Sequence, residues 1–255
     1  MIQALQRENP TVTAGGQTIL DRVEAVRDRT RLDPALPCIT LAYAQSLDGC
    51  IAEDHGVPTA ISNCQTLVLT HYLRAMHDAL LVGVNTVIVD DPQLTVRLAP
   101  GENPTPVIVD STLRMPLGSR LLGQDSHPIV ATTGGPFGSR HRALEDKGVD
   151  LVSVDANADG SIDLVDLFAK LRVRGIRSVL VEGGAKIITS ILAADLADQL
   201  VLTIAPQFLG GVRSVEPLFG RGPNRRPELT DIACETIGDD LVVQGELRRP
   251  AHGPK

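Results

Sequence analysis

The sequence predicts an α/β protein built on a mostly parallel central sheet. Two observations carry this prediction. Short runs rich in valine, isoleucine and leucine recur from Cys38 onward, and helical patterns separate most of them. Near-continuous apolar runs are typical of strands covered on both faces, and helical connections favour parallel neighbours. The last strands have shorter connections, which favours an antiparallel end of the sheet.

The expected elements follow one another along the chain. Strands are predicted at 38–46, 79–88, 105–111, 127–133, 149–155, 178–182, 197–210 and 241–247. Helices are predicted at 63–78, 162–175 and 185–196. The expected cap of the first helix is Asn63 or Ser62. Asp163 is expected to cap the second helix, and Gly175 lies just past its end.

Residues 1–36 differ from the rest of the chain. Ile19, Val23 and Val26 follow helical spacing with charged residues opposite them, and the stretch LDPALP then breaks the pattern. We therefore expect an N-terminal helical extension and linker over 1–36, followed by one domain over 37–250.

Composition and charge exclude several classes of function. The net charge is −7 and no long basic run occurs, which argues against nucleic acid or an anionic membrane as the main partner. No apolar run approaches the ~20 residues of a membrane span. The N-terminus lacks the basic start and apolar core of a secretory signal, so we expect a cytoplasmic location.

Cysteine and histidine spacing gives no metal site. The four cysteines form no C-x-x-C pair, and the six histidines show no H-E-x-x-H or similar pattern. Asp155–Asp166 matches the spacing of a calcium loop, but a predicted strand precedes it where an EF-hand requires a helix. We interpret it as a polar surface loop that leads into a capped helix, and expect no bound metal.

The stretch VEGGAKIITSIL begins at Val181 and joins a predicted strand to a predicted helix. A helix N-terminus preceded by glycine can bind an anion, because its free N–H groups and its dipole face the ligand. Strand–glycine–helix turns without a ligand are also common, so both interpretations stay open. Glu182 lies at the carboxyl end of a strand, where parallel sheets bind ligands.

The stretch LVGVNTVIVDDPQLTVR ends in a loop that is dense in polar residues. Arg97 could bind a phosphate through its planar guanidinium group. Alternatively, Asp90 and Asp91 cap a turn before Pro92, and Arg97 only pairs with one of them. A third stretch, SLDGCIA, contains an Asp-Gly pair that predicts a tight turn after a strand.

Taken together, these motifs resemble the riboflavin-biosynthesis pyrimidine reductases. The stretches SLDGCIA, VGVNTVIVDDPQLTVR, PVIVDSTLRMPL, VLVEGGAKIITSIL and DQLVLTIAPQFLGG occur in the family's order over roughly residues 37–247. The family includes the C-terminal half of a bifunctional deaminase–reductase and stand-alone archaeal and fungal enzymes. Nothing in the sequence resembles the deaminase half.

The resemblance implies a dihydrofolate-reductase-like three-layer fold over 37–250 and NADPH as cofactor. Family members reduce the ribosylamino group of a pyrimidine ribosylamine 5′-phosphate to a ribitylamino group. The pyrimidine is either 5-amino-6-(5-phosphoribosylamino)uracil or the 2,5-diaminopyrimidinone that precedes it. The alternatives are a pterin reductase on the same fold, or an NADPH-binding regulator without catalysis.

The resemblance also implies roles for individual residues. Substrate-binding positions are Arg74, Leu94, Arg97 and Glu182, of which Glu182 is the candidate catalytic residue. Cofactor-binding positions are Ala44, Ala60, Thr86, Asp90 and Ser111, together with the segment Gly183, Gly184, Ala185, Lys186, Ile187, Ile188, Thr189 and Ser190. Arg114 is added from its charge, as a candidate for binding the cofactor 2′-phosphate.

The sequence departs from the bacterial fused enzymes at three positions. Ala42 stands where they have a lysine, Pro58 where the family has a substrate serine, and Ala60 where it has an aromatic residue. These changes make the already deaminated substrate the less expected one. The family also implies a homodimer, for which the apolar strand 200–209 is a candidate interface edge.

Overall fold

The computed structural model describes residues 10–30, 35–123, 127–134, 138–218 and 226–248. Its strands are β1 (Cys38–Ser46), β2 (Cys50–Ala52), β3 (Ala79–Gly83), β4 (Thr105–Val109), β5 (Ile129–Thr132), β6 (Asp150–Ser153), β7 (Ser178–Val181), β8 (Gln199–Ala205), β9 (Val212–Arg213), β10 (Leu229–Ile237) and β11 (Asp240–Leu247). Its helices are α2 (Ala14–Thr30), α3 (Cys64–Ala75), α4 (Val84–Asp90), α5 (Ser139–Glu145), α6 (Leu164–Val173) and α7 (Ala185–Ala193), with a 3₁₀ turn η1 (Arg120–Gly123). No described helix is long and apolar enough to cross a membrane.

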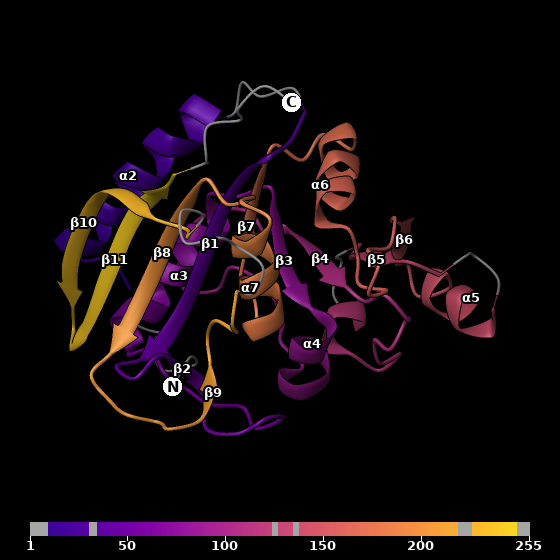
Figure 1. The fold of residues 1–255 in the computed structure, drawn as a ribbon, viewed down its shortest axis with the longest axis horizontal. Helices are drawn as coiled ribbons and strands as arrows, with labels where there is room; N and C mark the ends of the chain where they lie inside the picture. The colour runs from indigo at the N-terminus through magenta and orange to yellow at the C-terminus, as the bar shows by residue number, and fades with distance from the viewer. Residues whose placement is uncertain (1–9, 31–34, 124–126, 135–137, 219–225, 249–255) are drawn as a thin grey trace.

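A nine-stranded sheet forms the middle of the molecule (Figure 1), in the order β10-β11-β8-β1-β7-β3-β4-β5-β6. From β8 to β6 all neighbours run parallel, whereas β11 pairs antiparallel with β8 and with β10. The prediction of a mostly parallel sheet with an antiparallel end is therefore confirmed.

Helices cover both faces of the sheet and enclose two apolar clusters. One cluster joins the sheet to α6 and α7 through residues such as Phe168 and Ile188. The other joins it to α2, α3 and α4 through residues such as Ile19, Leu69 and Val87. Alternate residues along each strand enter opposite clusters, as the pleat requires. The expected three layers are present.

Helix α2 packs directly on the antiparallel end of the sheet, beside β10 and β11 (Figure 1). Its Ile19 and Val23 side chains are fully buried, and Arg22 pairs with Asp231 at 2.9 Å. The N-terminal helix expected within residues 1–36 therefore contributes to the same core as the sheet. The apolar face of α2 covers strands that would otherwise expose apolar side chains to water.

A chain of buried polar side chains runs beneath α2 and across the sheet to α3. Arg22 Nε donates to Gln244 Oε1 at 2.7 Å, and Gln244 Nε2 donates to Gln199 Oε1 at 3.2 Å. Gln199 Nε2 donates to Thr40 Oγ1, which lies 2.8 Å from His77 Nε2. Burial of His77 lowers its pKa to about 3, so this histidine is neutral in the folded protein at physiological pH.

Three expectations about the strands are corrected. The segment 79–88 is not one strand: β3 ends at Gly83 and α4 begins at Val84. The apolar strand 200–209 is not an edge, because β8 is paired on both sides. Strand β10 was not predicted, since its alternation of half-buried and exposed residues gives a weak apolar signal. Asn63 and Asp163 cap α3 and α6 as predicted.

Candidate functional site

The carboxyl ends of four neighbouring strands, β1, β7, β3 and β4, meet at one edge of the sheet. This is the place where open parallel sheets bind ligands, because helix N-termini and loops converge there. Most of the predicted site residues lie in these strands or directly after them: Ala44 in β1, Glu182 and Gly183 after β7, Thr86 and Asp90 in α4 after β3, and Ser111 and Arg114 after β4. Folding therefore gathers residues that are far apart in the sequence.

Arg74 and Glu182 form a two-bond ion pair at the centre of this edge. Arg74 Nε donates to Glu182 Oε1 at 2.7 Å, and Arg74 Nη2 donates to Glu182 Oε2 at 2.6 Å. Only 12% and 19% of these side chains are exposed. Burial works against the charge of Arg74, but the Glu182 carboxylate more than offsets this and raises the pKa of the guanidinium. The guanidinium is therefore charged, and the two hydrogen bonds fix the orientation of both side chains.

Arg97 lies beside this pair and is held by Thr95. Arg97 Nη1 donates to the Thr95 hydroxyl at 2.8 Å, and Arg74 Nη1 donates to the Thr95 carbonyl at 3.3 Å. Among the described residues, no carboxylate forms an ion pair with Arg97. The hypothesis that Arg97 only pairs with Asp90 or Asp91 is therefore wrong.

Asp91 instead closes the turn after α4. It adopts a left-handed backbone conformation with φ of 38°, and its carboxylate accepts from Ser119 and from the Arg120 amide. Of the two aspartates expected to cap a turn before Pro92, Asp91 does so, whereas Asp90 is the last residue of α4. Since Asp91 is engaged with η1, its charge does not neutralise Arg97.

The site therefore carries an excess of positive charge. Burial lowers the pKa of Arg97, and the nearby guanidinium groups of Arg74 and Arg120 lower it further. Glu182 is the one carboxylate that acts on Arg97 in the opposite direction. Two guanidinium groups, Arg74 and Arg97, beside the single carboxylate of Glu182 suit an anion such as phosphate, which arginine binds through paired N–H groups.

The two glycines before α7 have different roles. A Cβ atom on Gly183 would lie 2.8 Å from Ile187 Cβ, so Gly183 is required by packing within the turn. A Cβ atom on Gly184 would meet nothing within 4 Å. Gly184 is the N-cap of α7 and provides no side-chain cap. Packing therefore does not require glycine at 184, and no side chain of the N-cap residue satisfies the first N–H groups of α7.

The rest of the predicted cofactor segment follows α7 away from Gly184. Ile188 is fully buried in the core, and Ile187 packs against Gly183. Thr189 Oγ1 accepts from the Glu216 amide at 2.9 Å, while Lys186 and Ser190 are exposed. The structure thus places only the start of the segment, Gly183–Ile187, at the sheet edge.

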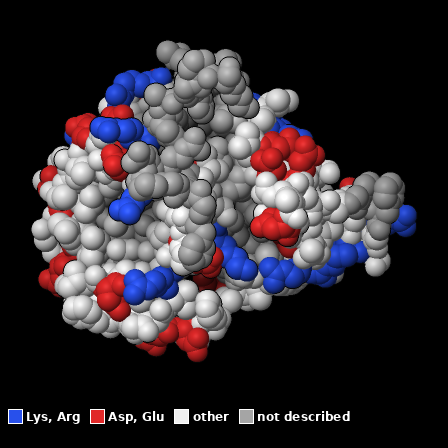
Figure 2. Space-filling model, viewed as in Figure 1, with Lys and Arg blue, Asp and Glu red and all other residues white. Residues whose placement is uncertain are grey.

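The loop after β4 lies next to α4. Exposed Arg114 donates to Asn85 Oδ1 at 2.8 Å, which connects this loop to the helix that carries Thr86 and Asp90. The Ser111 carbonyl accepts from the hydroxyls of Thr132 and Thr133. Figure 2 shows basic side chains following one another across this face between α4 and α5. This face of the molecule therefore presents basic side chains to solvent.

Two predicted contact residues stand apart from this cluster. The Leu94 side chain is 2% exposed and belongs to the apolar cluster beneath α3. Its φ of 51° is unusual for a leucine, so the backbone of this loop is held in a strained form. Ala60 lies in the exposed loop between β2 and α3. Leu94 is therefore buried as a whole residue, and Ala60 lies outside the cluster around Arg74 and Glu182.

The SLDG stretch forms the predicted turn, and its aspartate fixes a second loop. Asp48 accepts from the Leu209 amide at 3.1 Å and the Gly210 amide at 2.7 Å. Hydrogen bonds from Ser46 and from these amides lower the pKa of Asp48. This carboxylate therefore ties the β8–β9 loop to the turn after β1.

The calcium-like loop uses its carboxylates internally. Asp166 accepts from the Asp155 amide at 2.8 Å and pairs with Lys170 at 2.6 Å. Asp159 accepts from Ser161, and Asp163 caps α6. The loop between β6 and α6 is therefore arranged by its own hydrogen bonds, as a polar loop that leads into a capped helix.

Two residues at the site were missed by sequence reasoning. Thr95 connects Arg74 and Arg97, and His71 accepts the Arg97 backbone N–H at its Nδ1 atom, 3.0 Å away. Burial, with the charges of Arg74 and Arg97, lowers the pKa of His71 to about 3. Two features of the sequence could have identified these residues. Thr95 lies within the DDPQLTVR stretch. His71 lies three residues before Arg74, a spacing that places both side chains on one side of a helix.

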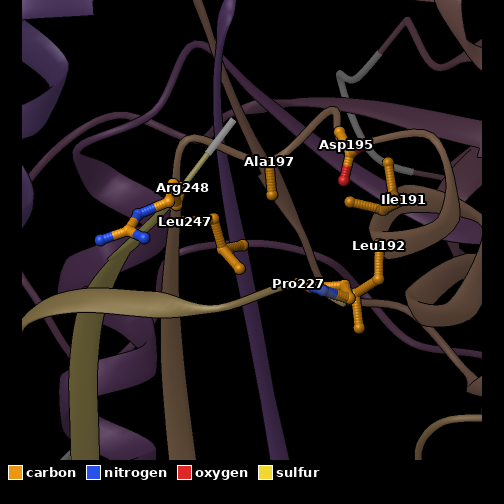
Figure 3. Close-up of a pocket in the computed structure, with 7 residues that line it drawn as sticks. All are labelled: Ile191, Leu192, Asp195, Ala197, Pro227, Leu247 and Arg248. Atoms are coloured by element: carbon orange, nitrogen blue, oxygen red, sulfur yellow. The ribbon is translucent and has the colours of Figure 1, made fainter. Parts of the chain in front are cut away.

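A small hollow elsewhere has a different character (Figure 3). It is lined by Ile191, Leu192, Asp195, Ala197, Pro227, Leu247 and Arg248. It lies at the amino end of β8 and the carboxyl ends of α7 and β11. This is the opposite edge of the sheet from Glu182 and Gly184, so the hollow does not belong to the site.

The RibD C-terminal domain family matches this chain over residues 37–243. The chain belongs to the RibD C-terminal domain family. The match includes every described site residue named above and begins after α2. Membership explains why the motifs occur in one fixed order, and it places the Arg74, Arg97 and Glu182 cluster within a domain shared by reductases.

Relatives of this RibD C-terminal domain include enzymes named as reductases. The 2,5-diamino-6-ribosylamino-4(3H)-pyrimidinone 5′-phosphate reductase of Methanothermobacter thermautotrophicus is 32% identical over 214 residues, covering 82% of this chain and 97% of the relative. The enzyme of the same name from Eremothecium gossypii is 36% identical over 194 residues, covering 69% and 76%. The riboflavin biosynthesis protein RibD of Aquifex aeolicus is 34% identical over 208 residues, and this chain spans only 57% of its length.

Solved structures have the same fold. The Saccharomyces cerevisiae riboflavin biosynthesis reductase Rib7 has a TM-score of 0.67 and 31% identity, covering 84% of this chain and 91% of that protein. Acinetobacter baumannii RibD has a TM-score of 0.72 and 26% identity, covering 84% of this chain and 59% of that protein. The similarity therefore extends over most of the RibD C-terminal domain described here.

Proposed function

We propose that this protein is an NADPH-dependent reductase of riboflavin biosynthesis. It reduces the ribosylamino group of a pyrimidine ribosylamine 5′-phosphate to a ribitylamino group. The observation that carries the proposal is the cluster of Arg74, Arg97 and Glu182, which combines an anion-binding pair of guanidinium groups with an oriented carboxylate. A substrate with both a phosphate and a polar sugar matches this combination.

Arg97 is the residue proposed to bind the substrate phosphate. Its guanidinium is held by a neutral hydroxyl and has no described carboxylate partner, so its charge is available to a ligand. Arg74 is proposed to contact the phosphate or the adjacent sugar while keeping Glu182 in place. A guanidinium group carries five donors, and three of those of Arg74 are already in use.

Glu182 is proposed to contact the substrate near the reacting carbon. Its carboxylate has about four acceptor positions, and Arg74 takes two of them. The remaining lone pairs can accept from a sugar hydroxyl or from the substrate amine. Since the orientation of the carboxylate is fixed by Arg74, this contact would align the ribose carbon with the cofactor.

The residues at the sheet edge fit an anionic dinucleotide. The open space at Gly184 and the free N–H groups of α7 suit a pyrophosphate, and exposed Arg114 suits the 2′-phosphate. When bound, NADPH supplies the hydride that an open-chain imine carbon of the substrate accepts, and the imine nitrogen takes up a proton. The protein contributes binding, orientation and charge.

The diaminopyrimidinone is proposed as the substrate rather than its deaminated product. Ala42 is 7% exposed and lies in the apolar cluster beneath α3, so no ammonium group is present at that position. Several relatives at 31–36% identity carry the name of the diaminopyrimidinone phosphate reductase. Both observations favour the substrate that still has its 2-amino group.

An assay of NADPH oxidation with each pyrimidine phosphate tests the proposal. We expect turnover with the diaminopyrimidinone and a much lower kcat/KM with the deaminated compound. Tight NADPH binding without turnover of either would instead support a regulator. Turnover of dihydrofolate that does not change on Arg97→Ala substitution would support a pterin reductase.

A homodimer and a cytoplasmic location complete the proposal. The homodimer is proposed from the similarity to the reductase family, and the cytoplasmic location from the sequence of the N-terminus. Because β8 is not an edge strand, a dimer would use another surface than 200–209. Sedimentation of the purified protein would show the oligomeric state, and a monomer would remove the homodimer.

A further inference from the structure

His71 is a fully buried histidine on α3 with one hydrogen-bonded and one unpartnered ring nitrogen. Its Nδ1 atom lies 3.0 Å from the backbone nitrogen of Arg97 and accepts the amide proton. Its Nε2 atom is buried and has no hydrogen-bond partner among the described residues. The Thr95 backbone also acts on the ring and raises its pKa, against the larger effect of burial. The His71 ring therefore faces the backbone of residues 95–97.

The contact fixes the tautomer of His71. A backbone amide can only donate, so Nδ1 must present its lone pair, and the proton of the neutral ring must be on Nε2. A buried N–H without a partner costs free energy that an apolar side chain of similar size would avoid. A role in packing alone would therefore favour a leucine here, whereas a role as acceptor requires a group such as imidazole.

His71 and Arg74 lie one helical turn apart on α3 and hold the same loop. Arg74 Nη1 donates to the carbonyl of Thr95, and His71 Nδ1 accepts from the amide of Arg97. The side chains of Thr95 and Arg97 are joined to each other at 2.8 Å. The backbone of 95–97 is thus fixed at two points against a rigid helix, which sets where the Arg97 guanidinium lies.

We propose that His71 is a positioning residue for phosphate recognition. It holds the Arg97 backbone so that the Arg97 guanidinium stands beside Arg74 and faces the phosphate of the substrate. This inference rests on the proposed function only in naming the substrate. The anion binding that it describes can be measured without turnover.

A matched pair of variants separates the acceptor from the packing. His71→Asn and His71→Leu introduce side chains of nearly the same shape, but only asparagine has an acceptor oxygen near the position of Nδ1. The full-length variants are compared with the native protein by calorimetric titration with ribose 5-phosphate, with ribose as the control ligand. NADPH binding is measured in parallel, because the site at α7 does not involve His71.

We expect His71→Leu to raise the Kd for ribose 5-phosphate about tenfold, which corresponds to about 1.4 kcal/mol, and His71→Asn to stay within about threefold of the native value. The Kd for NADPH stays unchanged in both. Equal weakening in both variants, or no weakening in either, would overturn the proposal. With pyrimidine phosphate as substrate, His71→Leu should raise KM by a similar factor and leave kcat within about threefold.

A measurement on the native protein keeps the proposal testable if a variant does not fold. Nitrogen shifts of isotope-labelled histidine report which ring nitrogen carries the proton. We expect the Nε2–H tautomer for His71 at neutral pH, and the Nδ1–H tautomer would refute the role of Nδ1 as acceptor. Absence of turnover with both pyrimidines would refute the proposed function but leave the difference between the Leu and Asn variants unaffected.

Discussion

Replacement of Glu182 by glutamine tests the ion pair at the centre of the site. The two hydrogen bonds of 2.7 and 2.6 Å join side chains that are 12% and 19% exposed. Glutamine keeps one acceptor for Arg74 and loses the charge and the other acceptor. Arg74 then remains largely buried, with the positive charge of Arg97 beside it.

The magnitude follows from these contacts. A hydrogen bond to a charged group contributes about 1.5–3 kcal/mol, and removal of one partner of a buried ion pair costs about 3–5 kcal/mol. Because this pair is partly exposed and one bond survives, we expect Glu182→Gln to lower the free energy of unfolding by about 2–3 kcal/mol. In a chain of this size that lowers Tm by about 4–12 °C.

Urea unfolding of a double-mutant cycle is the appropriate assay. Glu182→Gln, Arg74→Met and the double variant should give a coupling energy of about 2 kcal/mol. Glu246→Gln is the matched control, since it breaks the exposed pair with Arg29, which should change stability by less than about 1 kcal/mol. A coupling energy below about 0.5 kcal/mol between Arg74 and Glu182 would refute the reasoning.

The same variant has a second consequence that a general loss of stability cannot produce. Removal of the Glu182 charge leaves Arg74 and Arg97 without an opposing carboxylate, so inorganic phosphate should bind more tightly to Glu182→Gln than to the native protein. Reduction of the pyrimidine should fall, because the carboxylate proposed to orient the sugar is lost. Weaker phosphate binding in this variant would show that the anion does not bind at these arginines.

Three further predictions use the same geometry. Arg97→Ala should raise KM for the pyrimidine phosphate about 30- to 150-fold, from about 2–3 kcal/mol of lost charge-assisted binding, with kcat little changed in steady-state assays; an unchanged KM would place the phosphate elsewhere. Gly183→Ala should lower stability by about 1–3 kcal/mol in urea unfolding, because its Cβ would lie 2.8 Å from Ile187, whereas Gly184→Ala should keep the native stability and weaken NADPH binding. The pKa of His77 is about 3 in the folded protein and about 6.5 in the unfolded chain. Between these two pH values the unfolded chain therefore binds a proton at this residue that the folded protein does not. Stability should therefore fall as pH drops below about 6.5, by up to about 1.4 kcal/mol per pH unit, and a His77→Gln variant should show a shallower acid loss in unfolding measurements at several pH values.

Much of the fold could be predicted from local pattern. The apolar runs gave six of the sheet strands close to their observed bounds, and the caps Asn63 and Asp163 were identified because a side-chain acceptor at that position satisfies free N–H groups. The segment 79–88 could not be divided correctly by pattern alone. Its β-branched residues favour a strand, but β3 ends at Gly83, which is the N-cap residue of α4.

Strand order and edges could not be predicted from the sequence. The apolar character of β8 was compatible with an exposed edge, yet the strand is buried between β1 and β11. β10, the edge strand at the antiparallel end, is half exposed and has a bulge at 230–233, so its alternation is weak. Pairing partners depend on contacts between segments far apart in the chain, and local periodicity does not carry that information.

The sequence by itself indicated the carboxyl ends of the parallel strands as the place of the candidate site, and it pointed to some of the residues there. Glu182, Gly183 and Gly184 directly follow a predicted strand, and Arg97 follows the DDPQLTV stretch. Only the tertiary structure decided which contact each of these residues makes. Arg74 binds Glu182, Thr95 joins the two arginines, Gly183 serves packing and Gly184 faces open space. The physical reason is that the type of a residue fixes which charges and hydrogen bonds are possible for it. Which residues become its partners depends on distances of a few ångströms, and these distances exist only after the strands and α3 have packed.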